Sequence, residues 1–386
     1  MRKIAVVTVA RSDFGILRPL LEKIEKDADL SLQLMAAGMH LSEDHGMTIT
    51  EIEEAGFTVS DRIDMSLSMD SPEGIARSIG TGTIRFAESF GKAVPDILII
   101  LGDRFEVLAA ATAALPFGIP TAHIHGGEST EGLIDEAIRH SITKMSHLHF
   151  TSTRVYGERV IQMGEEPWRV MVCGAPGLDN LSNFIPLDRS ELEGLLGIPL
   201  EPAPLLVTYH PVTLEYGDTE DQIAQLLEGL DEIGMPVVFT YPNADTYGRR
   251  ISRAINDYTK SHQNSCALPN LGTRAYFSLM SHACAMVGNS SSGIIEAASF
   301  QLPVVNIGNR QRGRIRGRNV IDSGYRKEDI VAAVRKAVDN QFRSSLEGME
   351  NPYGDGKASG RIVQVLKEVK LDQDLLLKRF YRIEVG

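Results

Sequence analysis

The sequence predicts an α/β protein made of two Rossmann-like, doubly wound domains that face a cleft. Three observations predict it: short apolar runs alternate with helical patterns, the runs are apolar throughout, and a proline-rich stretch separates them into two series. Runs without polar alternation suit parallel strands covered on both faces. Alternating strands and helices are typical of doubly wound folds, and 386 residues fit two domains.

Most of the expected strands are short, and the segments between them have helical periodicity. The expected strands are Ile4–Val9, Leu32–Ala36, Ile97–Leu101, Thr121–Ile124, Leu148–Thr151, Val170–Cys173, Leu205–Tyr209, Val237–Tyr241, Ala285–Val287 and Val304–Ile307. The expected helices between them include Phe14–Lys26, Thr83–Lys92, Asp135–Lys144, Asp221–Glu232 and Lys327–Val338. The pattern therefore predicts one parallel sheet in each half of the chain.

The proline-rich stretch between Pro176 and Pro204 marks the expected boundary between the domains. We predict a first domain over residues 1–180, a linker over 181–203 and a second domain over 204–365. After Gly360 the pattern indicates only helix, so residues 366–386 are expected to form a helical tail.

Composition narrows the classes of function. The net charge of -12 argues against a general nucleic-acid-binding protein, which needs a broad basic face, but it allows a nucleotide ligand. Three widely spaced cysteines fit a cytoplasmic protein rather than a disulfide or zinc framework. No apolar stretch approaches the roughly 20 residues of a membrane span. We therefore expect a soluble protein without a membrane or nucleic-acid partner.

Polar residues gather directly after the apolar runs, where open parallel sheets place their ligands. The residues singled out by this position include Arg11, Asp103, Arg104, His125, Glu128, His210, Asn243, Ser290 and Ser291. One such residue would be weak evidence. The repetition at many strand ends predicts a ligand-binding edge in each domain.

The segment Gly288–Gly293 suggests an anion cradle. Its glycines allow close approach of the backbone, Ser290 and Ser291 supply hydroxyl donors, and a helical stretch Ile294–Phe300 follows. The alternative is an ordinary serine N-cap. Glu296 can hold ribose hydroxyls, or it can be a solvated glutamate favoured by the helix dipole.

Acid–base candidates are found in the first domain. Asp103 ends a strand beside Arg104, and His125 and Glu128 lie on a Gly-Gly loop. The expected helix Asp135–Lys144 adds Asp135, Glu136, Arg139 and His140. Spacings of three and four residues place Glu136, Arg139 and His140 on one face of this helix. For that helix, intrahelical ion pairs are the competing interpretation.

Four motifs in this order resemble the hydrolysing UDP-N-acetylglucosamine 2-epimerases, and the likeness runs from the first strand to about residue 365. The motifs are Gly102–Glu106, His123–Glu128, Ile134–Lys144 and Gly288–Gly293. The resemblance implies a glycosyltransferase-B-like fold, UDP held chiefly by the second domain, no cofactor, no metal and a homodimer.

The resemblance also implies roles for individual residues. Its UDP-sugar contacts would be Arg11, Arg104, Asn243, Ser290, Ser291, Glu296 and Arg310, and its catalytic residues Asp103, His125, Glu128, Asp135, Glu136 and His210. His210 would meet the diphosphate. Related enzymes often carry a glutamate where this chain has His125, so either His125 or Glu128 takes that role. Asp135 and Glu136 likewise compete for one role.

The family chemistry removes the proton at carbon 2 of UDP-N-acetylglucosamine and expels UDP, and water then adds to the glycal to give N-acetylmannosamine for sialic-type acids. One alternative is the related enzyme for UDP-N,N'-diacetylbacillosamine in legionaminic acid synthesis, which would share nearly every motif. A more distant alternative is a UDP-sugar glycosyltransferase, which would need an acceptor groove. The carboxylates of the first domain favour an epimerase over a non-catalytic sensor.

Overall fold

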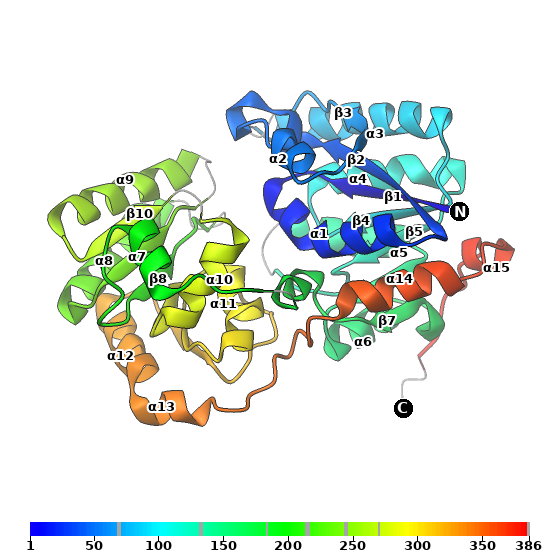
Figure 1. The fold of residues 1–386 in the computed structure, drawn as a ribbon. Helices are drawn as coiled ribbons and strands as arrows, with labels where there is room; N and C mark the ends of the chain where they lie inside the picture. The colour runs from blue at the N-terminus through cyan, green and yellow to red at the C-terminus, as the bar shows by residue number, and fades with distance from the viewer. Residues whose placement is uncertain are drawn as a thin grey trace. The chain divides into compact units, whose positions relative to one another are not determined.

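The computed structural model describes residues 1–67, 71–130, 134–182, 184–212, 217–242, 246–268 and 271–383. The chain forms two compact units (Figure 1). The first comprises Met1–Glu128, Ile134–Ser182 and Tyr353–Gly386, and the second is made chiefly of Asn183–Pro352. Each unit is built around its own parallel sheet, which confirms the predicted α/β class.

The first unit contains a seven-stranded parallel sheet in the order β3-β2-β1-β4-β5-β6-β7. Its strands are β1 (Arg2–Thr8), β2 (Leu30–Ala37), β3 (Val59–Ile63), β4 (Ile97–Leu101), β5 (Thr121–Ile124), β6 (Leu148–Thr151) and β7 (Val170–Val172). Its helices are α1 (Arg11–Lys26), α2 (Ile49–Glu54), α3 (Pro72–Lys92), α4 (Phe105–Ala114), α5 (Ile134–Met145), α6 (Arg154–Gln162), α14 (Ala358–Glu368) and α15 (Gln373–Leu376).

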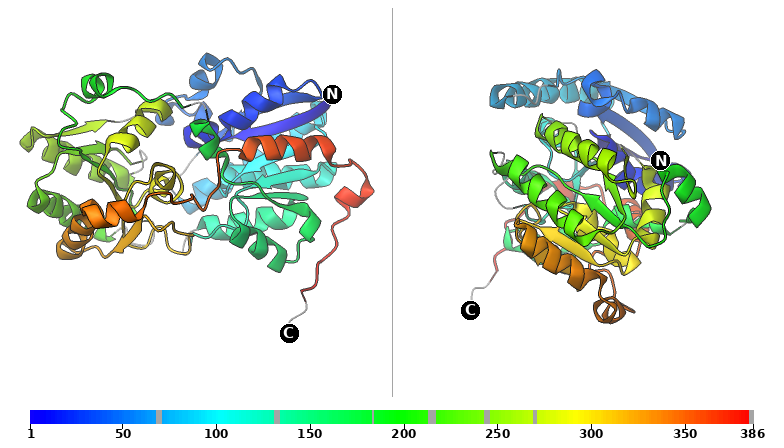
Figure 2. Two further views of the ribbon diagram at one scale, coloured as in Figure 1. Left: turned by 60° about the horizontal axis from the view of Figure 1, so that its bottom comes forward. Right: turned by 90° about the vertical axis from the view of Figure 1, so that its left-hand side faces the viewer.

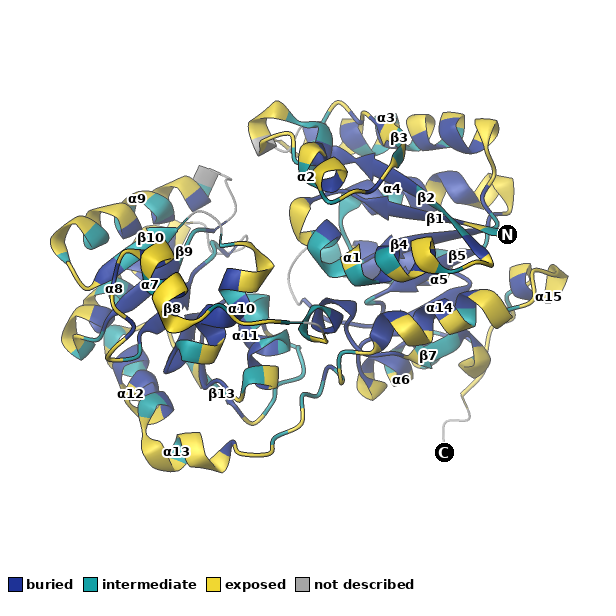
Figure 3. Ribbon diagram, viewed as in Figure 1, coloured by how far each residue is buried: buried dark blue, intermediate teal, exposed yellow. Residues whose placement is uncertain are grey.

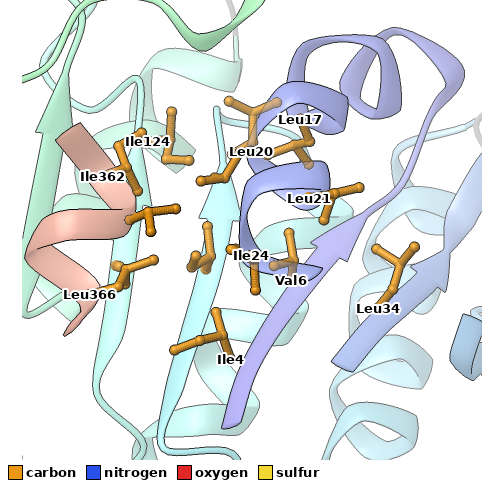
Figure 4. Close-up of a cluster of buried hydrophobic side chains, with 14 of the residues drawn as sticks. Ile4, Val6, Leu17, Leu20, Leu21, Ile24, Leu34, Ile124, Ile362 and Leu366 are labelled. Carbon is orange, nitrogen blue, oxygen red and sulfur yellow. The ribbon is translucent and has the colours of Figure 1, made fainter. Parts of the chain in front are cut away.

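Helices cover both faces of this sheet because its central strands are apolar on both. Ile4 and Val6 of β1 pack with α1 and α14, which lie side by side (Figure 2 and Figure 4). Ala5 and Val7, whose side chains point the other way, pack against α3, α4 and α5. Figure 3 shows the result, with buried strands and exposed residues on the outer sides of the helices.

The second unit repeats the arrangement with a six-stranded parallel sheet in the order β10-β9-β8-β11-β12-β13. Its strands are β8 (Leu205–Thr208), β9 (Val237–Thr240), β10 (Ser265–Leu268), β11 (Ala285–Gly288), β12 (Val304–Ile307) and β13 (Val320–Ser323). Its helices are α7 (Arg189–Leu196), α8 (Thr219–Ile233), α9 (Thr246–Ser261), α10 (Gly272–His282), α11 (Ser291–Ile295), α12 (Lys327–Val338) and α13 (Asn340–Ser345).

All the strands expected from apolar runs are present, within two residues at each end, but the sequence missed three. These are β3, β10 and β13, and each lies at an edge of its sheet. An edge strand has one neighbour and is partly exposed, so it needs no continuous apolar run. β3, with the sequence VSDRI and one buried residue, illustrates this.

The observed units differ from the expected domains in two places. The stretch expected to be a linker contains α7, whose Asp188 and Glu191 form a capping box. The end of the chain also returns to the first unit: α14, which the sequence assigned to the second domain, packs against α1 through Ile362 and Leu366 (Figure 4). The apolar face of α14 is visible in the sequence, but the surface that it covers is not.

The carboxylate of Asp179 caps α14 from a distant part of the chain. It accepts hydrogen bonds from the backbone N–H groups of Ala358 (2.8 Å) and Ser359 (2.6 Å) and is almost fully buried. Because these donors have no other helix partner, Asp179→Ala should lower the free energy of unfolding of the first unit by about 2–3 kcal/mol. Urea unfolding followed by the fluorescence of Trp168, the one tryptophan of the chain, measures this loss.

Ser71→Ala is the matched control, because Ser71 caps α3 in the same unit with a single bond (3.0 Å to the N–H of Gly74) and is exposed. It should cost about 1 kcal/mol. Equal losses from the two variants would show that the buried carboxylate stabilises the unit no more than an ordinary surface cap.

Candidate active site

Both sheets reverse their strand order beside their first strand, so each has a switch point where ligands bind in doubly wound proteins. In the first unit this point lies between β1 and β4, and in the second between β8 and β11. The residues that follow these four strands are Arg11 after β1, Asp103 and Arg104 after β4, His210 after β8, and Asn289, Ser290 and Ser291 after β11. Six of the thirteen predicted site residues, Arg11, Asp103, Arg104, His210, Ser290 and Ser291, therefore lie at the switch points of the two sheets.

A buried guanidinium connects the acid–base candidates of the first unit. Arg139 of α5 is 1% exposed and donates to the carboxylate of Asp103, to Glu136 Oε2 (2.6 Å) and to the backbone oxygen of Glu128 (3.0 Å). Burial opposes its charge, but Asp103, Glu128 and Glu136 together more than offset this and raise the pKa of Arg139. The ion-pair interpretation of this helix is therefore correct for Arg139, and it also brings Asp103 and Glu136 together.

His125, Glu128 and Ser152 form a second connected group. His125 has a φ of +65°, a conformation that a non-glycine residue adopts at a cost and that often marks a functional residue. Its Nδ1 is hydrogen-bonded to the buried carboxylate of Glu128, and the same oxygen accepts a bond from Ser152 Oγ (2.8 Å). The carboxylate is thus positioned to orient the imidazole, as in carboxylate–histidine pairs of known enzymes.

Two glycines make the turn that carries this pair. Gly127 has a φ of +78°, and a Cβ there would lie 2.3 Å from the backbone oxygen of Tyr156. At Gly126 a Cβ would meet His123 Nδ1 at 3.0 Å. The Gly-Gly sequence is therefore required because the loop packs directly against α6 and against a buried histidine.

Two carboxyl groups of the first unit have raised pKa values. Burial, with the nearby charges of Glu106 and Asp103, raises the pKa of Asp13 to about 6 although Arg104 opposes this. Burial and the charge of Asp103 raise that of Asp135 to about 6. Groups with such pKa values exchange protons readily near neutral pH, and they concentrate at active sites.

Asp135 and Glu136, the two carboxylates of α5 that compete for one role, differ in the residues that they pair with. Glu136 is bonded to Arg139 and lies 3.3 Å from His140 Nε2. Asp135 forms no ion pair within the described ranges. Arg104, whose charge lies near Asp135, forms its ion pair with Glu106 rather than with Asp135 (Nη2 to Oε1, 3.0 Å).

In the second unit, the uncharged side chain of Asn289 connects the segments that follow β8 and β11. The side chain of Asn289 is fully buried and bonds both backbone groups of His210, accepting from its N–H (2.7 Å) and donating to its oxygen (2.8 Å). The backbone oxygen of Asn289 in turn accepts bonds from Arg310 (3.0 Å) and Gln311 (2.8 Å). Burial, followed by the charge of Arg310, lowers the pKa of His210 to about 3.

The cradle differs in detail from the expected one. The helix begins at Ser291 rather than Ile294 and ends after one turn, and Glu296 is its C-terminal cap before a 3₁₀ turn (Ala297–Phe300). Ser290 is an N-cap that accepts a bond from the N–H of Ser292 (3.3 Å). Gly288 has a φ of +134°, and a Cβ there would lie 2.0 Å from the backbone oxygen of Thr208. β8 and β11 thus approach closely beneath the cradle.

Two further candidates have other surroundings. Arg11 forms an exposed ion pair with Glu51 of α2 (2.8 Å). Asn243 lies outside the described residues. Within the ranges that the structure covers, no group of three His, Cys, Asp or Glu side chains is arranged to hold a metal ion. Nor does that part of the chain contain a helix that is both long and apolar enough to cross a membrane.

The sequence missed three residues of this region. Ser152 follows β6 directly, and the strand-end rule would have found it. His40 follows β2 and is fully buried between Thr8 Oγ1 (2.9 Å) and Thr48 Oγ1 (2.8 Å), a position that the same rule indicates. Glu106 ends the motif Gly102–Glu106 and lies in the first turn of α4, where a glutamate is common, so the motif indicated no separate role for it.

Comparisons with known proteins identify the family of the chain. A family model described as UDP-N-acetylglucosamine 2-epimerase matches residues 22–367. The chain belongs to the UDP-N-acetylglucosamine 2-epimerase family. It is 40% identical over 382 residues to "GDP/UDP-N,N'-diacetylbacillosamine 2-epimerase (hydrolyzing)" of Campylobacter jejuni, with 98% of each chain covered. It is 36% identical over 386 residues to "Polysialic acid biosynthesis protein P7" of Escherichia coli, with 99% of this chain and 98% of that protein covered.

A solved structure of the same family supports the fold. The UDP-GlcNAc 2-epimerase from Neisseria meningitidis bound to UDP-GlcNAc is similar with a TM-score of 0.82 and 19% sequence identity. The alignment covers 95% of this chain and all of that one. This member of the family therefore has the two Rossmann-like domains expected from its sequence.

The tight packing of the turn after β5 leads to a prediction about stability. Gly127→Ala should lower the free energy of unfolding by about 3 kcal/mol or more, because it adds a steric clash with α6 to the strain of a positive φ. Gly118→Ala, with a φ of +62° and no atom within 4 Å of the added Cβ, isolates the strain and should cost about 1 kcal/mol. Urea unfolding of both variants measures the difference, and equal losses would contradict the close packing of the turn.

Proposed function

We propose that this protein is a hydrolysing UDP-N-acetylglucosamine 2-epimerase, which converts UDP-N-acetylglucosamine and water to N-acetylmannosamine and UDP. The observation that carries the proposal is the cluster of acid–base residues at the carboxyl ends of β4 and β5, in a chain of this family. A protein that only binds nucleotide sugars would not need an imidazole oriented by a buried carboxylate. We assign proton transfer to the first unit and nucleotide binding to the second.

The reaction begins with removal of the proton at carbon 2, and UDP leaves from carbon 1 on the opposite face to give a glycal. Carbon 2 is a poor acid, so the base must be held close to it. Asp135, with a pKa of about 6, is the proposed base. Asp103 is held in its charged form by Arg139, and its negative charge helps to raise the pKa of Asp135. Water then adds its oxygen to carbon 1 while carbon 2 takes a proton from the other face.

His125 is the proposed second acid–base group. Its φ of +65° presents the side chain at the end of β5, and the bond to Glu128 leaves Nε2 as the nitrogen that can exchange a proton. Glu128 acts through His125, because its bonded oxygen is already shared by His125 and Ser152. This assigns the catalytic role to His125 and an orienting role to Glu128.

The second unit supplies the proposed nucleotide contacts. Ser290 and Ser291 donate to the diphosphate, Arg310 neutralises its charge, and Glu296 holds the ribose hydroxyls. With a pKa of about 3, His210 is neutral at pH 7, so it donates a hydrogen bond to the departing diphosphate rather than a full charge. Removing UDP becomes easier as its negative charge is stabilised.

Three further contacts complete the proposal. Arg11 can exchange its exposed ion pair with Glu51 for a ligand at little cost, because such surface pairs are worth about 0–1 kcal/mol. Arg104 is held by Glu106 and offers its remaining N–H groups. Asn243 is proposed on the resemblance alone.

UDP-N,N'-diacetylbacillosamine is a second candidate substrate. The relative from Campylobacter jejuni, 40% identical over nearly the whole chain, is named for that sugar. The Escherichia coli relative, at 36% identity, is named for polysialic acid biosynthesis, which favours N-acetylmannosamine as the product. Both reactions use the same bases and the same leaving group, so only the sugar pocket distinguishes them.

Other features of the proposal concern the setting of the enzyme. We propose a place in sialic-type or legionaminic acid synthesis, and a chemistry that needs neither cofactor nor metal. The free cysteines Cys173, Cys266 and Cys284 support a cytoplasmic location. A homodimer is expected from the family resemblance, and static light scattering tests it.

The first experiment is to incubate the protein with UDP-N-acetylglucosamine in deuterated water and to follow the products by proton NMR. Elimination and hydration should yield N-acetylmannosamine with deuterium at carbon 2 and one equivalent of UDP, because the proton added at carbon 2 comes from solvent. A parallel reaction with UDP-N,N'-diacetylbacillosamine decides between the substrates. Release of UDP from neither would refute the proposed function.

Asp135→Asn tests the proposed base. In the unaltered enzyme kcat/KM should fall as pH decreases through about 6, because protonated Asp135 cannot accept the proton at carbon 2. The variant should lose about 100- to 10,000-fold in kcat and lose this acid limb. Glu136→Gln is the matched comparison: it weakens the anchoring of Arg139 but should keep the limb near pH 6. The reverse result would assign the base role to Glu136.

A further inference from the structure

Arg104 and Arg139 lie among the carboxylates near the switch point of the first unit, and each forms ion pairs with different carboxylates. Arg139 is committed to Asp103 and Glu136. Arg104 forms its one ion pair with Glu106, among the residues whose positions the structure gives (Nη2 to Oε1, 3.0 Å). The electrostatic neighbours of Arg104 also include Asp13 and Asp135, yet neither forms an ion pair with it in the described ranges.

Glu106 is an unusual partner because it is completely buried. Its exposed fraction is 0%, and in the described part of the chain its second oxygen, Oε2, has no hydrogen-bond partner. Space for it is made by Gly38, where a Cβ would lie 3.0 Å from Glu106 Cγ and 3.2 Å from Oε1. Burying a carboxylate away from solvent is costly unless it is paired, and Arg104 is the partner that offsets this cost.

Contacts on more than one side hold the guanidinium of Arg104 beside Glu106. Arg104 Nη2 also contacts the sulfur of Met39 at 3.0 Å, and Nε has no acceptor within the described residues. Its side chain is about a quarter exposed, so burial adds to the strength of its pair with Glu106. The pair therefore keeps the positive charge beside α4.

We propose that Glu106 is a positioning residue that acts through Arg104: it holds the guanidinium so that Asp13 and Asp135 are left without a basic partner. The inference rests on the proposed function, in which Asp135 is a base. A carboxylate that is tied to an arginine is a poor proton acceptor, because the ion pair stabilises its charged form. Glu106 thus preserves the two carboxyl groups that can exchange protons near neutral pH.

The electrostatics of the surrounding groups agree with this assignment. Burial raises the pKa of Asp13 to about 6, and Arg104 opposes the shift while Glu106 and Asp103 reinforce it. The groups that face this region from the neighbouring elements are Asp13 of α1, His40 after β2, Asp103 after β4, Glu106 of α4, and Asp135 and Arg139 of α5. His40 adds no charge at neutral pH, because burial and Arg104 lower its pKa to about 4.

Glu106→Gln keeps the shape of the side chain and removes its charge. Arg104 then has no carboxylate of its own and pairs with Asp13 or Asp135. The acid limb of the kcat/KM profile should move to lower pH by about one unit, because an arginine within contact distance lowers a carboxyl pKa by about 1–3 units. The value of kcat at pH 7 should fall about tenfold or more. Glu106→Asp, which keeps the charge, should largely restore both quantities.

Glu165→Gln is the matched control. Glu165 is an equally buried carboxylate of the first unit, bonded to Lys144 (2.5 Å), Lys378 (2.8 Å) and His149 (3.0 Å) outside the site. It should lower stability as Glu106→Gln does but leave the pH profile in place. If Glu106→Gln lowers the melting temperature without moving the acid limb, Glu106 is merely structural and the proposal is wrong.

A second readout does not depend on activity. In protein labelled with ¹³C at aspartate side-chain carboxyls, Asp13→Asn and Asp135→Asn identify the two resonances, and their titration gives both pKa values directly. Glu106→Gln should lower at least one of them from about 6, and unchanged titrations would overturn the proposal. If the unaltered protein releases no UDP from either substrate, the proposed function fails, whereas the titration still decides the role of Glu106. If Glu106→Gln does not fold, Glu106→Asp is titrated, and a downward shift smaller than one unit is expected.

Discussion

The buried guanidinium of Arg139 is the interaction on which the first unit's site depends. A charge removed from water must be compensated by partners of good geometry. Its three acceptors come from different segments: Asp103 after β4, Glu128 after β5, and Glu136 in the first turn of α5. One side chain therefore fixes the relative positions of these three segments, which carry Asp103, His125, Glu128, Asp135 and Glu136. Their arrangement is as rigid as the pairing that buries the arginine.

In the second unit, an uncharged side chain rather than an arginine holds together the segments that follow the strands. Asn289 joins the segment after β11 to the segment after β8 by two bonds to His210, and an amide can both donate and accept. Arg310 is bonded to a backbone oxygen there. This contrast fits the proposed division of labour. A unit that transfers protons needs carboxylates whose charge is controlled, whereas a unit that holds a diphosphate needs cations that remain charged.

The carboxyl groups with raised pKa values also have a consequence for stability. In the folded protein Asp13 and Asp135 have pKa values of about 6, above the ordinary value of about 3.8. Their contribution to stability is therefore present at low pH and is lost as pH rises through about 4 to 6, because ionisation is easier in the unfolded chain. A carboxyl group that only stabilised the fold would have a lowered pKa, and its contribution to stability would be lost as pH falls. This pattern is common at active sites, where function opposes stability.

Much of the fold and part of the site could be predicted from the sequence. Continuous apolar runs identified the central strands because both faces of such strands must be covered. The edge strands β3, β10 and β13 escaped because exposure on one side removes that requirement. Strand-end polarity singled out Asp103, His125 and His210 as candidates, and ordered motifs identified the family that the comparisons confirm.

The sequence by itself determined the two parallel sheets, the ends of the strands at which polar residues gather, and the family. Only the tertiary structure decided which groups meet there. The pairing of Arg139 with Asp103 spans 36 residues, and the return of α14 to the first unit joins Leu366 to strands near the N-terminus. The burial of Glu106 depends on Gly38 leaving room for it. Periodicity and composition record what one segment needs from its surroundings, but the partner that satisfies the need is chosen by contacts between distant segments.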